Sequence, residues 1–428
     1  MSSPPEEVTE DASADRRGEA SSALVVQYAA GSALVRLADE GARIGLTLVA
    51  LQRLNSPAVG GVLVAALLLP HVVAAPLVGM LVDRARRPRL VISAAAMGFA
   101  AALAAAAVGL ARLPTALVVV ILLAGGCCGP ALTGALSSQL PGLVPDSRLP
   151  RAFGIDSLTY NTAGIAGPAL AAVIATASSP SAAILGLTGC AVLGAVLIAA
   201  LPIPPRPQRF PAERTDTLAG LRLLVHDRTL AAVTGATSLG QLGMGALPLI
   251  AALVAEQHHA TAAAGWLLTA VAAGGLLGSL AWTWRRAPSE YARTVVMIGL
   301  AGVGVPLAVA AFSHSLPLTT TLFVLAGLSN GPLFGALLIT RNQQAPEQLR
   351  SQVFTLGAGA KLTATAAGAA LGGLIAGHTS VPVLLAAAGA SSLGAAALGR
   401  LALPQAKTSL DNSQPVHRRR APGAPGQA

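Results

Sequence analysis

The chain has 428 residues, of which 54% are hydrophobic and only 11% are charged. Soluble domains usually carry about 25% charged residues, so this composition excludes an ordinary water-soluble globule and favours a protein embedded in lipid. The net charge of +10 does not indicate nucleic-acid binding, because the basic residues lie in short segments between long apolar runs.

Twelve apolar runs are long enough to cross a bilayer, which takes roughly 20 residues in a helix. Six runs precede a polar stretch and six follow it. We therefore predict an all-α membrane protein with twelve transmembrane helices. The runs cover residues 24–51, 57–82, 90–110, 114–140, 151–176, 181–203, 229–254, 261–284, 293–313, 316–341, 351–377 and 380–403.

Polar segments divide the chain into two halves and two tails. The acidic segment 1–22 lacks the apolar core of a signal peptide, so we predict a disordered cytoplasmic tail there. The two halves, 23–203 and 229–403, are joined by the Pro- and Arg-rich stretch 204–228, which we interpret as a cytoplasmic loop. The low-complexity segment 404–428 predicts a second disordered cytoplasmic tail.

The distribution of basic residues predicts the orientation in the membrane. Lys and Arg are enriched in the cytoplasmic loops of membrane proteins. If the N-terminus is cytoplasmic, 23 of the 28 basic residues fall in inner segments, Arg341 among them, and only Arg53 and Arg112 fall in outer loops. Both termini are therefore predicted to be cytoplasmic.

The two halves resemble one another. Residues 143–175 align without gaps on residues 344–376, at an offset of 346 − 145 = 201. This alignment predicts two parallel six-helix pseudo-repeats, an arrangement that places the substrate site near the bilayer midplane between the halves. The informative matches are Pro145 with Pro346, Phe153 with Phe354, Thr162 with Thr363, Gly167 with Gly368 and Ile174 with Ile375.

The loop after the second run carries a recognisable signature. Residues 79–89 read Gly-Met-Leu-Val-Asp-Arg-Ala-Arg-Arg-Pro-Arg. This resembles the G-x-x-x-D-R-x-G-R-R signature of the major facilitator superfamily, with departures at Arg86 and Pro88. In that family the loop contributes to a cytoplasmic gate, whereas anchoring by positive charge alone would explain only the Arg residues. The resemblance implies a gate role for Gly79, Asp83, Arg84 and Arg87.

The fifth run carries a second signature. Gly154, Ala163, Gly167 and Pro168 are similar to the G-x8-G-x3-G-P-x2-G-G exporter motif of the drug:proton antiporters in that superfamily. The stretch 140–153 also resembles the macrolide-efflux-like branch. Small residues permit close helix packing, and Pro removes a backbone donor. Any close-packed transmembrane helix would share these properties, and the fourth run lacks the Arg that many proton-coupled exporters carry.

Four charged residues interrupt the first run: Arg36, Asp39, Glu40 and Arg43. Charges inside a membrane are costly and indicate function. The four share one helix face, so we expect Arg36 to pair with Asp39 or Glu40, and Arg43 with Asp39. Burial favours a protonated carboxyl group and a nearby Arg favours the charged form, so either acid is a candidate for the coupling proton. A purely structural ion cluster is the alternative.

Other polar residues lie inside the predicted spans and are candidates for the substrate cavity. Lys361 occupies the repeat-equivalent position of Tyr160 (361 − 201 = 160), and would pair with an acid across the halves or contact an anionic substrate. Asp156, one helical turn from Tyr160, is equally a candidate for a gate contact, a substrate contact or proton transfer. His71, Asn161, Gln241 and Asn330 each have a simple alternative as a helix–helix hydrogen bond. The candidates are His71, Asp156, Tyr160, Asn161, Gln241, Asn330 and Lys361.

These features predict a secondary active transporter in the cell membrane of a bacterium rather than an enzyme. Our preferred hypothesis is proton-coupled efflux of small amphipathic molecules, with an importer or uniporter as the alternative and a membrane enzyme or receptor as a third. We expect no metal, because the three Cys lie in apolar runs. No phosphate-binding loop is present, so we expect no cofactor beyond the proton gradient. The expected partners are a small-molecule substrate, protons and lipid, with no nucleic acid, and the expected state is a monomer.

Overall fold

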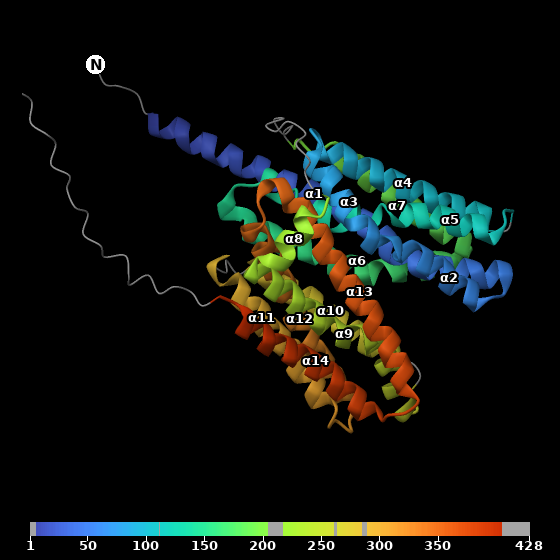
Figure 1. Ribbon diagram of the computed structural model, residues 1–428. Helices are drawn as coiled ribbons and strands as arrows, with labels where there is room; N and C mark the ends of the chain where they lie inside the picture. The colour runs from blue at the N-terminus through green and yellow to red at the C-terminus, as the bar shows by residue number, and fades with distance from the viewer. Residues whose placement is uncertain (1–5, 111, 204–216, 261–262, 285–288, 405–428) are drawn as a thin grey trace, which may run out of the picture.

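The structure is a computed structural model that describes residues 6–110, 112–203, 217–260, 263–284 and 289–404, with side chains described from residue 22. Every regular element within these residues is helical. The first half (blue to green in Figure 1) and the second half (yellow-green to red) form two bundles. All of the predicted tail beyond residue 404 and most of the predicted linker, residues 204–216, lie outside the described residues.

Proline interrupts two of the helices predicted in the first half. The second span divides at Leu69, because Pro70 lacks the backbone N–H that a continuous helix requires. The fourth span changes near Pro130 into a short π-helix, η1. The elements are α1 (Glu6–Leu54), α2 (Pro57–Leu68), α3 (Pro70–Arg84), α4 (Pro88–Gly109), α5 (Thr115–Gly126), η1 (Ala131–Ala135), α6 (Leu149–Ala177) and α7 (Pro180–Ala199).

The second half is more regular, but it is preceded by a helix that we did not predict. Helix α8 (Ala219–His226) lies in the segment predicted as a loop, and its Gly220 and Leu224 are buried. It contacts α9 and α13. The remaining helices are α9 (Arg228–Gln257), α10 (Ala263–Trp284), α11 (Ala292–Ala310), α12 (Leu316–Gln344), α13 (Arg350–Ala376) and α14 (Val381–Ala402).

The predicted number of membrane spans is confirmed. In the described part of the chain, 11 helical segments are long and apolar enough to cross a membrane. Helix α1 is not among them, since polar and charged residues lower its hydropathy, but it packs along α6 and α7 within the first half. With α1 the described chain has twelve spans, so α1 enters and α14 leaves the bundle at the same end (Figure 1).

The N-terminal tail differs from the prediction. We expected no regular structure over residues 1–22, whereas α1 already begins at Glu6. Glu, Ala and Arg, which are good helix formers, are frequent in this segment, so a helix can continue beyond the apolar residues of the span.

The two halves share one packing pattern, as the internal repeat predicts. Helix α1 contacts α6 and α7 in the first half, and α9 contacts α13 and α14 in the second. Helix α6 begins at Leu149 and α13 at Arg350, which reproduces the offset of 350 − 149 = 201. The pseudo-repeat is therefore confirmed in three dimensions.

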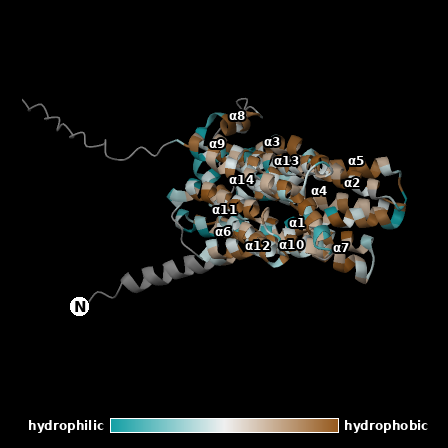
Figure 2. Cartoon of the chain, turned by 90° about the horizontal axis from the view of Figure 1, so that it is seen from below, coloured by the Kyte–Doolittle hydropathy of each residue, from teal (hydrophilic) through white to brown (hydrophobic). Residues whose placement is uncertain are grey.

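Apolar side chains cover the flanks of the bundle, where lipid would lie. Figure 2 shows brown, hydrophobic ribbon along most of the helices, with hydrophilic colour gathered towards their ends. Leu374, Val73 and Phe312 are exposed by more than two thirds, although side chains of this size are normally buried in a soluble protein. The buried apolar core of the bundle consists largely of Ala and Leu, followed by Val and Ile.

Candidate functional site

A buried ion pair joins α1 to α6 in the middle of the first half. The Arg36 Nη1 atom lies 2.7 Å from the Asp156 Oδ1 atom, and the side chains are only 2% and 0% exposed. Tyr28 donates a hydrogen bond of 2.7 Å to the same carboxylate oxygen. Arg36 also donates to Thr159 and, over 3.0 Å, to Ser137. These bonds hold the guanidinium group in one position.

This arrangement corrects one of our predictions. We expected Arg36 to pair within α1, with Asp39 or Glu40, but it pairs with Asp156 on another helix. The side chain of Asp156 is fully buried, so it needs a cation more than the partly exposed Glu40 does. Asp156 is thus the partner of Arg36 in this conformation, and its role towards substrate stays a prediction.

Arg43 forms ion pairs with both acids of α1, Asp39 and Glu40. Its Nη2 atom lies 3.2 Å from Asp39 Oδ2, and its Nη1 atom lies 2.7 Å from Glu40 Oε2. The pairing of Arg43 with Asp39 is as we predicted. Two carboxylates therefore share one guanidinium group, which leaves one negative charge in excess when both acids are ionised.

The aromatic rings of Tyr160 and Phe334 lie between the Arg36–Asp156 ion pair and Lys361 of the second half. The guanidinium carbon of Arg36 lies 3.6 Å from the centre of the Tyr160 ring. The Tyr160 ring packs edge-on against Phe334 of α12, with 4.9 Å between the ring centres. On the far side of that layer, Lys361 Nζ lies 4.3 Å from the centre of the Phe334 ring. Tyr160 and Lys361, which the repeat relates, thus meet at one boundary between the halves.

The small residues of the fifth-run motif bring α6 close to α1. A Cβ atom on Gly167 would lie 2.6 Å from the Leu37 carbonyl oxygen and 3.2 Å from the Glu40 Cβ atom. The repeat-equivalent Gly368 makes the same kind of approach to Leu242 of α9. Pro168 lies inside α6, and Ala163 is buried. Gly154 serves a different contact, because its Cβ atom would meet Thr283 of α10 at 2.6 Å.

The signature loop connects the two halves through Asp83. Its Oδ1 and Oδ2 atoms accept hydrogen bonds of 2.9 and 3.0 Å from the backbone N–H groups of Ser351 and Gln352. These groups open α13, where the helix dipole favours a negative charge. Gly79 permits this approach, since a Cβ atom there would lie 2.6 Å from the Gln352 Cα atom.

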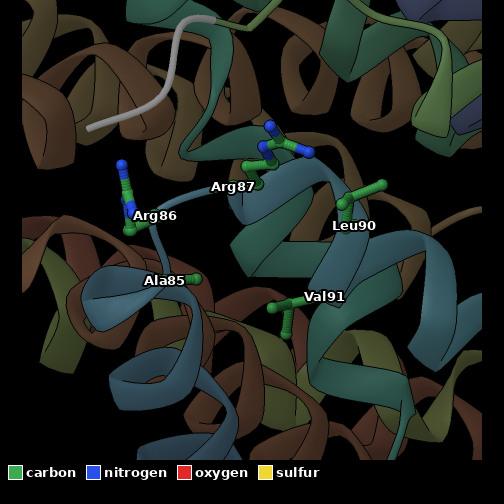
Figure 3. Close-up of a pocket in the computed structure, with 5 residues that line it drawn as sticks. All are labelled: Ala85, Arg86, Arg87, Leu90 and Val91. Atoms are coloured by element: carbon green, nitrogen blue, oxygen red, sulfur yellow. The ribbon is translucent and has the colours of Figure 1, made fainter. Parts of the chain in front are cut away.

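The basic residues of the signature lie on the surface. Arg84 and Arg87 are exposed, and Figure 3 shows Arg86 and Arg87 on the loop with Leu90 and Val91 on the following helix α4. These four residues and Ala85 line a pocket of about 450 Å³. The pocket is separate from the Arg36–Asp156 site, and a gate role for Arg84 and Arg87 stays a prediction.

The remaining polar candidates divide between the interface and helix packing. The Asn161 side-chain amide donates a hydrogen bond of 2.8 Å to the Ser279 hydroxyl of α10, and this bond links the two halves. The Gln241 side-chain oxygen accepts a hydrogen bond of 3.3 Å from the Thr365 hydroxyl, and both residues belong to the second half. Buried His71 lies 3.4 Å from Thr133 of η1. Asn330 is half-buried on α12.

Arg341 is a buried residue that we did not predict as part of the site. We counted it among the inner basic segments, but its side chain is only 2% exposed and lies over Gly357 of α13. Arg341 ends an apolar run, the usual position of a residue that anchors a helix at the membrane surface. Only the packing of α12 against α13 reveals that the side chain turns inward.

The described polar contacts between the halves gather towards the end with the Asp83 loop. The hydroxyl oxygens of Ser157 and Ser279 lie 3.2 Å apart. The Thr355 hydroxyl donates a hydrogen bond of 2.8 Å to the backbone carbonyl of Ala75. Beyond Lys361, only Gly368 and Gly372 of α13 are buried. The halves are therefore closed against each other at this Arg-rich end.

The comparisons with known proteins agree with this architecture. The sequence model of the Major Facilitator Superfamily matches residues 21–284 and 230–426. A Sinorhizobium fredii protein named as an uncharacterized MFS-type transporter is 26% identical over 391 residues, which cover 87% of this chain and 92% of that protein.

Two solved structures show the same fold. A bacterial homologue of the iron transporter ferroportin in an outward-facing state has a TM-score of 0.72 at 16% identity, with 89% of this chain and 99% of that chain covered. The proton:xylose symporter XylE has a TM-score of 0.68 at 15% identity, with 90% and 96% covered. The twelve spans, the pseudo-repeat and the family match lead to one conclusion: the chain belongs to the major facilitator superfamily of membrane transporters.

Proposed function

We propose that the protein is a proton-coupled exporter of small amphipathic molecules that works by alternating access. It resides as a monomer in a bacterial cell membrane with both termini in the cytoplasm, and no cofactor takes part. The family match supports transport, and the fifth-run motif favours export. The fold neighbours carry different substrates by name, so they do not select among them.

The observation that carries the proton coupling is the sharing of Arg43 by Asp39 and Glu40. One guanidinium group balances only one carboxylate, and an unbalanced charge inside a membrane is costly. Binding of one proton removes this excess charge. Asp39 is 8% exposed and Glu40 is 33% exposed, so Glu40 is the acid that a proton reaches more easily in this conformation.

Proton movement in inverted membrane vesicles tests the coupling. A proton gradient is imposed, and a fluorescent pH probe reports proton release when each member of a panel of cationic, neutral and anionic aromatic compounds is added. Wild-type vesicles should show a compound-dependent signal. Glu40→Gln should abolish this signal, since a neutral amide cannot release a proton, whereas Asp39→Asn should retain part of it.

The matched control is Asp146→Asn, because Asp146 is an exposed acid at the start of a short 3-10 helix, η3 (Asp146–Arg148), outside the ion cluster. It should behave like the wild type. If compounds cross the membrane while neither acid substitution alters proton movement, the proton-coupled mechanism is overturned. Equilibration of a labelled solute without any proton signal would identify a uniporter on the same fold.

A further inference from the structure

Arg341 is buried without the partners that a buried cation normally has. Its Nε and Nη2 atoms have no hydrogen-bond partner among the described residues, and only 2% of the residue is exposed. It forms no ion pair within the described part of the chain, in contrast to Arg36 and Arg43, each of which contacts a carboxylate. A buried guanidinium group left in this state is costly.

A second cation lies next to Arg341. The Arg341 guanidinium group packs over Gly357, one helical turn before Lys361 on α13, and the two positive charges repel one another. Lys361 contacts the face of the Phe334 ring, and it too has no carboxylate within ion-pair distance among the described residues. Glu40 attracts Lys361 from across the interface, but Arg43 already binds that carboxylate.

The charge balance also favours an anion. We define the central charge cluster as Arg36, Asp39, Glu40, Arg43, Asp156, Arg341 and Lys361. It holds four cations and three carboxylates, so its net charge is 4 − 3 = +1, and the two unpaired cations both belong to the second half. With both acids of α1 ionised, one negative charge from outside the chain would neutralise the cluster, and when one acid binds the coupling proton the excess positive charge rises to +2.

Surface anchoring does not account for Arg341, because an anchoring side chain extends to the lipid headgroups and stays exposed. The geometry points instead to a binding site in which Arg341 and Lys361 hold the carboxylate of an organic anion. The buried Phe334 ring lies beside Lys361 and packs edge-on against the Tyr160 ring, with 4.9 Å between the ring centres, so the surroundings of the two cations are apolar and aromatic. This substrate class rests on the transport function proposed above, and it narrows amphipathic molecules to those with a negative group.

Calorimetric titration of the full-length chain, purified in detergent, tests the site with two probes of one shape. The probes are 2-naphthoate and 2-naphthylmethylammonium, which share a ring system and differ in charge. We expect 2-naphthoate to bind and the ammonium compound not to bind. Absence of 2-naphthoate binding, or equal affinity for both compounds, overturns the proposal.

Substitutions locate the bound anion. Lys361→Gln and Arg341→Gln should each weaken 2-naphthoate binding about tenfold or more, since each removes a charge-assisted hydrogen bond. Lys361→Arg keeps the charge and should restore most of the affinity. Arg400→Gln is the matched control, because Arg400 is an exposed cation at the end of α14. Wild-type affinity in both Gln variants would overturn the proposal.

Thermal unfolding of the ligand-free variants separates binding from a structural role. Arg341→Gln removes a buried charge without an ion-pair partner among the described residues, so its melting temperature should equal or exceed that of the wild type. A large decrease would show that Arg341 stabilises the fold, and would overturn its assignment to an anion site.

The outcomes also separate this proposal from the proton coupling. If 2-naphthoate binds as described while Asp39→Asn and Glu40→Gln leave proton movement unchanged, the anion site stands and the coupling fails. If cationic compounds drive proton movement while 2-naphthoate does not bind, the coupling stands and the anion site fails.

Discussion

Asp156 and Arg36 depend on one another because neither is accessible to water. A charge that loses its partner inside a protein retains its desolvation cost, which makes such a loss far more damaging than that of a surface ion pair. Tyr28 and Thr159 add hydrogen bonds but no compensating charge. The pair therefore stabilises the packing of α1 on α6 as long as both members are present.

Removing one member of this pair should destabilise the protein. Asp156→Asn leaves the Arg36 guanidinium group without a counter-charge, so the free energy of unfolding should fall by about 3–5 kcal/mol. Unfolding by SDS titration measures the change. The double variant Arg36→Met, Asp156→Leu should recover most of the loss, and Asp146→Asn should cost little. Wild-type stability of the single variant would contradict a paired Asp156.

Single residues were predicted from sequence only in part. The charged residues of α1 could be identified as unusual, and the pairing of Arg43 with Asp39 follows from helical spacing. The partner of Arg36 could not be found in this way, since 120 positions separate it from Asp156. The burial of Arg341 could not be predicted for a related reason. Its position at the end of an apolar run is typical of a residue that anchors a helix at the membrane surface, and only the packing against Gly357 directs the side chain inward.

At the scale of elements, the approach of α6 to α1 depends on Gly167. A side chain there would meet backbone atoms of Leu37 and Gly41, neither of which can move without shifting α1. Gly167→Val should therefore lower the free energy of unfolding by about 1–3 kcal/mol, the usual cost of overpacking. Because Glu40 lies at the same contact, we also expect the proton signal to fall.

Gly164 provides a matched control on the same helix. A Cβ atom at Gly164 would have no heavy atom within 4 Å, so Gly164→Val adds the same side chain without a clash. SDS titration and the vesicle measurement should return values close to the wild type for Gly164→Val. Equal behaviour of the two variants would show that close packing at Gly167 is unimportant.

Helices were easier to predict than their interruptions. The apolar runs predicted the spans because lipid exposure imposes a minimum length on each helix. The division at Leu69 was missed although Pro70 is visible in the sequence, since proline is often tolerated within transmembrane helices. Helix α8 was missed because eight residues with buried Gly220 and Leu224 gain their stability from α9 and α13 rather than from local propensity.

For the whole molecule, Asp83 stabilises the conformation that is closed at the Arg-rich end. Its two hydrogen bonds to the start of α13 exist only while the halves meet there. Asp83→Asn removes the charge that the helix dipole favours, and hydrogen bonds to charged groups contribute about 1.5–3 kcal/mol. We expect the ratio of open to closed molecules at this end to rise about tenfold or more.

Distance measurements between spin labels check this expectation. Labels at the exposed positions Arg86 and Glu347, on a background with Cys127, Cys128 and Cys190 replaced by Ser, report the separation of the two halves. The distribution should shift to longer distances in Asp83→Asn. An unchanged distribution would show that other contacts, such as that between Ser138 and Ser351, are sufficient for closure.

The architecture of the whole molecule was the most predictable level. Twelve spans, the division into halves and the repeat all follow from patterns that extend over many residues, so errors at single positions do not alter them. The conformation could not be predicted, because the alternating access that we propose requires one sequence to form at least two arrangements. The offset of 201 relates α6 to α13, but it contains no information on which end is closed.

The long separation between Arg36 and Asp156 has a consequence during biosynthesis. A ribosome adds roughly 5–20 residues each second, so about 6–24 s pass between synthesis of the arginine and synthesis of its partner 120 residues later. During that interval Arg36 lacks its partner on α6, and the acids closest to it along the chain are Asp39 and Glu40 of α1 itself. We therefore expect the buried ion pairs of α1 to be rearranged when α6 emerges, so that the first half matures as a unit rather than helix by helix.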